Sequence, residues 1–84
     1  MNISTKEALA TRVWFDDDNI RVLLVDGRQI GVTLVYYPRL LKATPQQRLV
    51  FEMSGNGRGL HWEQLDEDLS VEGLVLGIPD RTKR

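Results

Sequence analysis

Within IRVLLVDGRQIGVTLVY, residues 20–36, two runs rich in β-branched and aliphatic residues flank Asp26 and Gly27. Asp-Gly between two such runs is a strong sequence signal for a β-hairpin. A two-residue loop would put the apolar side chains of the two strands on opposite faces, whereas a three-residue loop pairs Val22 with Ile30 on one face. The longer loop also gives Gly27 the left-handed conformation that glycine adopts without steric cost. The stretch therefore predicts an antiparallel hairpin with a glycine-bulged loop.

The rest of the chain predicts an α+β fold in a single domain, residues 1–84. A strand before the hairpin, joined to it by the polar turn of residues 16–19, makes a three-stranded antiparallel meander. A later strand brings the antiparallel sheet to about four strands, and two or three short helices complete the domain. The expected strands are 8–15, 20–25, 29–36 and 60–65, the expected helices are 45–53 and 70–77, and residues 80–84 are expected to form a flexible tail.

Residues typical of helix ends occur at the boundaries of the expected helices. Thr44 before Pro45 is typical of a capped helix start, and Ser70 is in a similar position before the second helix. Gly77 is expected to end that helix. A single turn of helix is also expected to begin at Pro38, because proline fits the first helical position. In the helix expected at 45–53, Leu49, Val50 and Met53 would form a narrow apolar stripe that helps to hold the short helix by packing.

Composition limits the classes of function. The chain has no cysteine, so neither a disulfide framework nor a thiolate metal site is available. Its longest apolar runs fall far short of the ~20 residues of a membrane span, and the start lacks the apolar core of a signal peptide. We therefore expect a cytoplasmic protein that does not enter a membrane. The net charge of −1 hides an acidic segment, because residues 59–80 carry six acids and no Lys or Arg.

The glycine-rich segment 55–59 has a superficial likeness to a phosphate-binding loop. The dinucleotide-binding fingerprint needs three glycines at the spacing GxGxxG, between a strand and a helix. Here Leu60 occupies the sixth position, and we expect a helix before the segment and a strand after it. We interpret it as a reversing loop and expect no cofactor.

Two stretches resemble a known family. The first joins Asp-Gly-Arg at 26–28 to Tyr-Pro-Arg-Leu at 37–40, and the second joins Gly-Leu-His-Trp at 59–62 to Leu-Asp-Glu-Asp-Leu-Ser-Val-Glu-Gly-Leu at 65–74. Over about residues 10–77 the chain resembles the bacterial family DUF2442, a family of proteins of unknown function. The motif positions to which we assign a structural role are Gly27, Pro38, Gly59, His61 and Trp62.

The resemblance implies a small α+β protein of bacteria or phages with no assigned catalytic activity. Some members of the family are fused to a DNA-binding helix-turn-helix domain. Many are encoded beside a second small protein, in an arrangement similar to a toxin–antitoxin pair. The resemblance thus implies a protein partner, the product of an adjacent gene, with this chain in an antitoxin-like role.

His61, the one histidine, is the candidate for acid–base chemistry, with Asp66 or Asp68 as its orienting carboxylate. We favour a structural role for it, because no nucleophile with a recognisable motif accompanies it. The triplet Asp66-Glu67-Asp68 could bind a metal, but it has neither zinc nor calcium ligand spacing. We expect it to form a turn before the second helix, and we expect no metal site and no catalytic residue.

Two tryptophans and one arginine complete the candidates. We expect Trp62 in the core. Alternation over 8–15 puts Val13 and Phe15 on one face and Trp14 on the other, where an exposed tryptophan would mark a binding patch. Arg39 could line a basic side of the helical region.

The function that these observations favour is a non-catalytic protein-interaction module. Asp66, Glu67 and Asp68, together with Trp14 and Arg39, are its candidate partner-binding residues. A homodimer is also expected, because a short sheet with open edges invites strand pairing. The alternatives are a nucleic-acid accessory domain, disfavoured by the acidic second half, and an enzyme based on His61.

Overall fold

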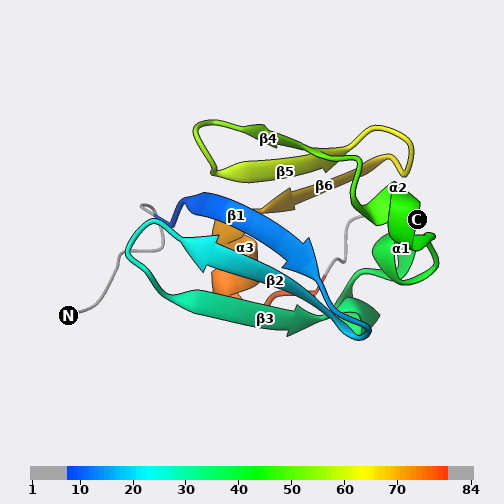
Figure 1. The fold of residues 1–84 in the computed structure, drawn as a ribbon, viewed down its shortest axis with the longest axis horizontal. Helices are drawn as coiled ribbons and strands as arrows, with labels where there is room; N and C mark the ends of the chain where they lie inside the picture. Colours follow the sequence, from blue (N-terminus) through cyan, green and yellow to red (C-terminus); the bar gives the residue numbers. More distant parts are fainter. Residues whose placement is uncertain (1–7, 80–84) are drawn as a thin grey trace.

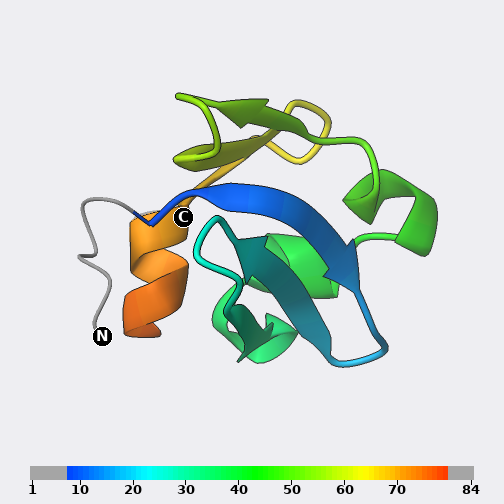
Figure 2. The same cartoon turned by 60° about the vertical axis from the view of Figure 1, so that its left-hand side comes forward.

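The computed structural model describes residues 8–79, and these form an α+β fold. Two three-stranded antiparallel sheets, each a meander, stack on each other (Figures 1 and 2). The first sheet holds β1 (Ala10–Phe15), β2 (Asn19–Leu24) and β3 (Gln29–Thr33), and the second holds β4 (Glu52–Ser54), β5 (Gly59–Trp62) and β6 (Glu67–Ser70). A 3₁₀ turn, η2 (Leu34–Tyr36), and the helices α1 (Pro38–Leu41) and α2 (Pro45–Arg48) connect the sheets, and α3 (Val71–Leu76) follows β6. Across residues 8–79, no helix is long and apolar enough to cross a membrane.

The hairpin of β2 and β3 has the register that the sequence predicts. Val22 pairs with Ile30, and the Leu24 amide donates a 2.8 Å hydrogen bond to the Arg28 carbonyl. Gly27 has a φ of +93° in the three-residue loop. The glycine-bulged hairpin is therefore confirmed, and it sets the apolar faces of both strands toward one core.

β1 departs from the strict alternation expected of it. The register against β2 shifts between Ala10 and Arg12, so β1 contains a bulge. Ala10 is buried before the bulge, and Val13 and Phe15 pack against the core after it. One extra residue reverses the parity of the side chains. Both halves of β1 thereby face the core, although the sequence pattern assigned them to opposite faces.

The strand expected at 29–36 ends at Thr33, because the chain turns there into η2. The Thr33 hydroxyl accepts a hydrogen bond from the Val35 amide and so caps the turn. Leu34 is fully buried. The turn buries that side chain while Val35 and Tyr36 are exposed.

The helix expected at 45–53 has the predicted start but ends at Arg48. Thr44 and Gln47 form a reciprocal capping box, with Pro45 in the first turn. The segment 52–54 forms β4 instead, in which Met53 pairs with Leu60. The apolar stripe expected on this helix does not form, and Leu49, Val50 and Met53 are exposed. One turn of helix has little stability of its own, so pairing with β5 determines the path of the chain.

The second sheet also corrects two expectations. The strand expected at 60–65 is β5, which ends at Trp62, and residues 63–66 form the turn. Asp66 has a φ of +51° in that turn, whereas Glu67 and Asp68 belong to β6 rather than to a turn. The short polar residues at 66–68 correctly indicated a turn near this position, but they did not show that it spans residues 63–66. The helix after β6 begins and ends as expected, with Ser70 as its N-cap and Gly77 in the left-handed conformation at its C-terminus.

The core lies between the two sheets and α3. Its largest fully buried side chains include Trp62, Tyr37, Ile20, Leu24, Leu34, Leu40 and Leu60. The loop between β4 and β5 links this core to the first sheet, because the Ala10 amide donates a 2.8 Å hydrogen bond to the Gly57 carbonyl. The Val71 amide likewise donates to the Arg58 carbonyl at 2.8 Å. Segment 55–59 is thus a reversing loop, with a strand before it where we expected a helix.

Candidate functional site

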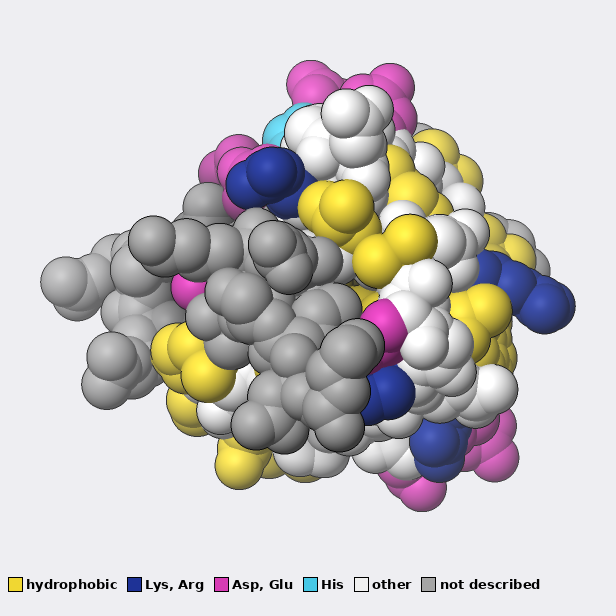
Figure 3. Space-filling view, turned by 90° about the vertical axis from the view of Figure 1, so that its left-hand side faces the viewer, with side chains coloured by type: hydrophobic (Ala, Val, Ile, Leu, Met, Phe, Trp, Pro, Cys, Tyr) yellow, Lys and Arg dark blue, Asp and Glu magenta, His cyan; other side chains and the backbone are white. Residues whose placement is uncertain are grey.

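A histidine flanked by acidic side chains lies on the outer face of the second sheet. Antiparallel pairing sets Glu52 of β4 and Asp68 of β6 directly opposite His61 of β5. Side chains at directly paired positions share one face of a sheet. Leu60 and Trp62 point to the other face and are buried. Figure 3 shows the histidine beside acidic side chains at the top of the molecule.

Both ring nitrogens of His61 are bonded to carboxylates. Nδ1 lies 2.5 Å from Oδ1 of Asp68, and Nε2 lies 2.9 Å from Oε1 of Glu63. The His61 side chain is 33% exposed, whereas that of Glu63 is 90% exposed. The hydrogen bond to Glu63, followed by the one to Asp68, raises the pKa of His61 above its ordinary value of 6.5. This arrangement stabilises the imidazolium, because both ring N–H groups then donate to an ionised acceptor.

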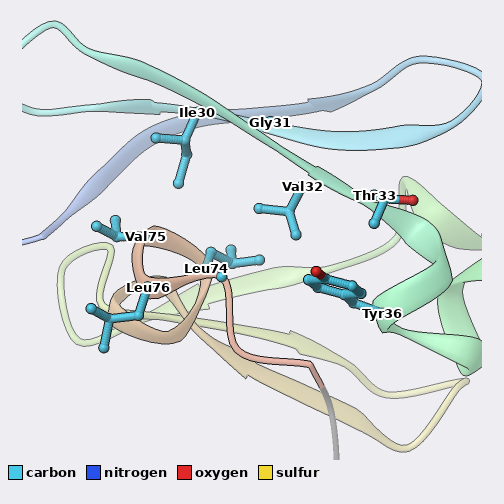
Figure 4. A pocket seen from close by; sticks show the side chains of 9 residues that line it. Ile30, Gly31, Val32, Thr33, Tyr36, Leu74, Val75 and Leu76 are labelled. Carbon is cyan, nitrogen blue, oxygen red and sulfur yellow. The ribbon is translucent and has the colours of Figure 1, made fainter.

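Carboxylates contact both ring nitrogens of His61 in this structure. A general base needs a nitrogen that can accept a proton from a substrate, and here both nitrogens already have carboxylate partners. Two cavities of the described chain lie elsewhere. One, of about 420 Å³, lies between β3 and α3 (Figure 4). The other, of about 270 Å³, lies beside α2. Among residues 8–79, no group of three or more His, Cys, Asp or Glu side chains could hold a metal ion.

The three carboxylates of the triplet 66–68 do not form one cluster. Asp66 is in the turn, where Arg39 of α1 lies 3.5 Å from its carboxylate and also donates to its backbone carbonyl. Glu67 is fully buried, and Asp68 is on the outer face with His61. Neighbouring residues of a strand point to opposite faces. The interpretation of Glu67 as a partner-binding surface residue is therefore wrong.

The tryptophans have different environments. Trp62 is fully buried, its indole N–H donates to the Arg48 carbonyl at 2.9 Å, and its ring centroid lies 5.6 Å from that of Phe51. Trp14 is only partly buried, and the Arg12 guanidinium lies 5.4 Å from its ring centroid. Trp14 belongs to the first sheet, whereas His61 belongs to the second.

The two remaining motif residues have backbone roles. Pro38 occupies the first turn of α1. Gly59 lies in the middle of the second sheet, paired with Ser54 on one side and Ser70 on the other. A Cβ at this position would lie 2.8 Å from the Ser54 hydroxyl. The absence of a Cβ at Gly59 thus leaves room for the Ser54 side chain on the sheet face that carries His61.

The comparison with protein families agrees with this fold and these motifs. The model of the family described as "Protein of unknown function (DUF2442)" matches residues 10–80. The chain belongs to the DUF2442 family.

Two solved structures are similar to this DUF2442 chain. One is a protein of unknown function from Rhodospirillum rubrum, which is 33% identical with a TM-score of 0.77, over 90% of this chain and 94% of that one. The other is the solution structure of an uncharacterised protein from Chromobacterium violaceum, 26% identical with a TM-score of 0.73, over 93% of this chain and 73% of that one. No curated protein matches the sequence.

Sequence reasoning missed two acidic residues of this candidate site. Glu63 follows His61 by two residues, so alternation over 60–65 places both on one face, but Glu63 was not recognised as a site residue. Glu52 gave no such signal, because the pattern of residues 45–53 indicated a helix rather than a strand. The pairing of β4 with β5 places it there.

The raised pKa of His61 can be measured directly. We expect the NMR titration of its ring protons to have a midpoint above 6.5, and the variant Glu63→Gln to move that midpoint down. Because the folded pKa exceeds the unfolded one, the stabilising contribution is complete below about pH 6.5 and disappears as the pH rises through the folded pKa. Asp17→Asn, on an exposed loop, is the control for loss of a distant charge. A midpoint that Glu63→Gln leaves unchanged would contradict the observed contact.

Proposed function

We propose that this DUF2442 domain is a non-catalytic interaction module that binds a basic surface of another protein. The observation that carries the proposal is the acidic outer face of the second sheet. Glu52 and Asp68 flank His61 across three adjacent strands, and Glu63 bonds its other nitrogen. This cluster, Glu52, Glu63 and Asp68 around His61, is called the acidic face below.

Charge and exposure support this role. The Glu63 and Asp68 side chains are 90% and 63% exposed, and residues 59–79 carry five acids and no lysine or arginine. An exposed surface of one sign attracts an oppositely charged partner over several ångströms and raises the rate of association. The acidic face contains three carboxylates and one imidazole, so its acidic groups outnumber its basic one even when His61 is protonated.

Exposed apolar side chains just before β4 also support an interface. Leu49 and Val50, in the segment that leads into β4, are 64% and 54% exposed. They immediately precede Phe51, whose ring packs against Trp62 at the end of β5. Large apolar side chains that remain exposed on a folded domain are typical of protein-binding surfaces.

The proposed partner is the product of an adjacent gene, with this chain in an antitoxin-like role. The first test is co-expression of the two proteins, followed by size-exclusion chromatography with light scattering. A stoichiometric complex is the expected result. Two folded proteins that elute separately would remove the antitoxin-like role.

The acidic face is tested by association kinetics with that partner. We expect the double variant Glu63→Gln/Asp68→Asn to slow association about three- to tenfold at low salt, and much less in 0.5 M salt, since salt screens the attraction. The double variant Asp17→Asn/Asp18→Asn removes the same charge from an exposed loop of the first sheet and serves as the matched control. Equal rates for both variants would show that general charge, rather than the acidic face, directs binding.

A further inference from the structure

The outer edge of β3 has its backbone groups directed away from the sheet. The Leu24 amide donates to the Arg28 carbonyl at one end of the hairpin, and the Leu34 amide donates to the Asp18 carbonyl at the other. In an antiparallel pair, inward and outward bonding alternates along the strand. The N–H and C=O groups of Gln29, Gly31 and Thr33 therefore point outward. Among residues 8–79, no strand pairs with this edge, which lies at the bottom of the first sheet in Figure 1.

The sequence of β3 is symmetric in chemical type about Gly31. It runs polar, apolar, glycine, apolar, polar: Gln29, Ile30, Gly31, Val32 and Thr33. It contains no charged residue and no proline, the usual protection of an open edge against pairing. An antiparallel copy centred on Gly31 would set Ile30 opposite Val32 on one face and Gln29 opposite Thr33 on the other.

We propose that β3 pairs with β3 of a second copy of this chain, with Gly31 opposite Gly31. The pairing forms about six backbone hydrogen bonds and joins two three-stranded sheets into one of six strands. A two-fold axis makes the same edge serve both copies. This interface uses the first sheet and is independent of the acidic face.

The residues around the β3 edge are compatible with pairing to a second copy of the chain. Ile30 and Val32 point toward Leu74 and Val75 of α3 across the cavity of about 420 Å³ (Figure 4). Among its lining residues, Tyr36 and Leu76 are 38% and 55% exposed. A second copy brings the same apolar side chains to the two-fold axis, so each set covers the other.

The opposite face of β3 also tolerates the pairing. The Arg21 side chain lies over Gly31, within 2.9 Å of where a Cβ would be. Its charge is balanced by Asp16, 2.6 Å from its Nε. The hydrogen bond from Arg21 is the main reason that the pKa of Asp16 is lowered to about 2, so the ion pair persists at neutral pH. Each Arg21 near the two-fold axis therefore keeps its own carboxylate partner, which reduces repulsion between the two arginines.

The test begins with the mass of the whole chain by light scattering and sedimentation equilibrium. We expect a dimer that dissociates on dilution. Gly31→Pro removes the central N–H donor, whereas Gly31→Ala keeps it and adds the same Cβ against Arg21. The proline variant should be a folded monomer by circular dichroism, and the alanine variant a dimer. A wild-type chain that is monomeric at every concentration overturns the proposal.

A cysteine pair tests the register without relying on a destabilising change. The chain has no cysteine of its own. Gly31 positions across the axis would have Cα atoms about 5.5 Å apart, within the range of a disulfide. Under mild oxidation, Gly31→Cys should crosslink at least about fivefold more than Gln29→Cys, whose copies lie about four residues apart along the paired strands. Equal crosslinking, or a dimer retained by a folded Gly31→Pro variant, would contradict this interface.

Discussion

Gly57→Ala is expected to destabilise the fold by about 3 kcal/mol or more, a large part of the stability of a small domain. Gly57 has a φ of +98°, where a side chain is strained. A Cβ there would overlap the Ala10 carbonyl oxygen and lie 3.0 Å from the Ala10 amide nitrogen. Those are backbone atoms of β1 and cannot rotate away. Urea unfolding monitored by circular dichroism measures the loss.

Gly27→Ala is the matched control, because Gly27 has a φ of +93° but nothing within 4 Å of the added Cβ. It isolates the cost of the backbone conformation, about 1–2 kcal/mol. The excess cost at Gly57 then measures the close approach of the two sheets. If both variants lose the same free energy of unfolding, the close approach of Gly57 to Ala10 does not add to the cost of the substitution.

Trp62→Ala is expected to cost about 3–5 kcal/mol in the same measurement. The substitution leaves a cavity between β5 and the helical region and removes the donor to the Arg48 carbonyl. It also removes the ring that packs against Phe51. Trp14→Ala deletes the same atoms from a partly exposed position and should cost about 1 kcal/mol.

Trp62→Phe separates the two contributions of Trp62. It keeps an aromatic ring and leaves the Arg48 carbonyl without its donor, for an expected cost of about 1–3 kcal/mol. A value for Trp62→Ala close to that of Trp14→Ala would show that the core tolerates collapse at this position.

The first sheet was largely predictable from sequence because its signals are local. A glycine turn and two alternating strands leave a single register that buries both apolar sets, and Val22 pairs with Ile30 as expected. The bulge in β1 was not predictable from those signals. Its one extra residue has no special composition, and it is favoured because both Ala10 and Val13 then reach the core.

The second sheet was predicted less well because its strands are three or four residues long. The helix cap at Thr44 was correct, but nothing between Gln47 and Glu52 indicates where the helix ends. Tertiary pairing with β5 overrides the helical pattern there. The candidate site shows the same limit. His61 and Asp68 were both singled out, whereas Glu52 joins them only because β4 exists.

The order of elements along the chain has a kinetic consequence. Each sheet is a meander, so its strands close short loops with little loss of chain entropy. The union of the sheets joins residues far apart in sequence. Ala10 bonds Gly57 across the sheets, and side chains of β2 and Trp62 belong to one core cluster. Contacts of that separation are the slow ones to form. The docking of two locally assembled halves, rather than the growth of either, therefore limits how fast this chain folds.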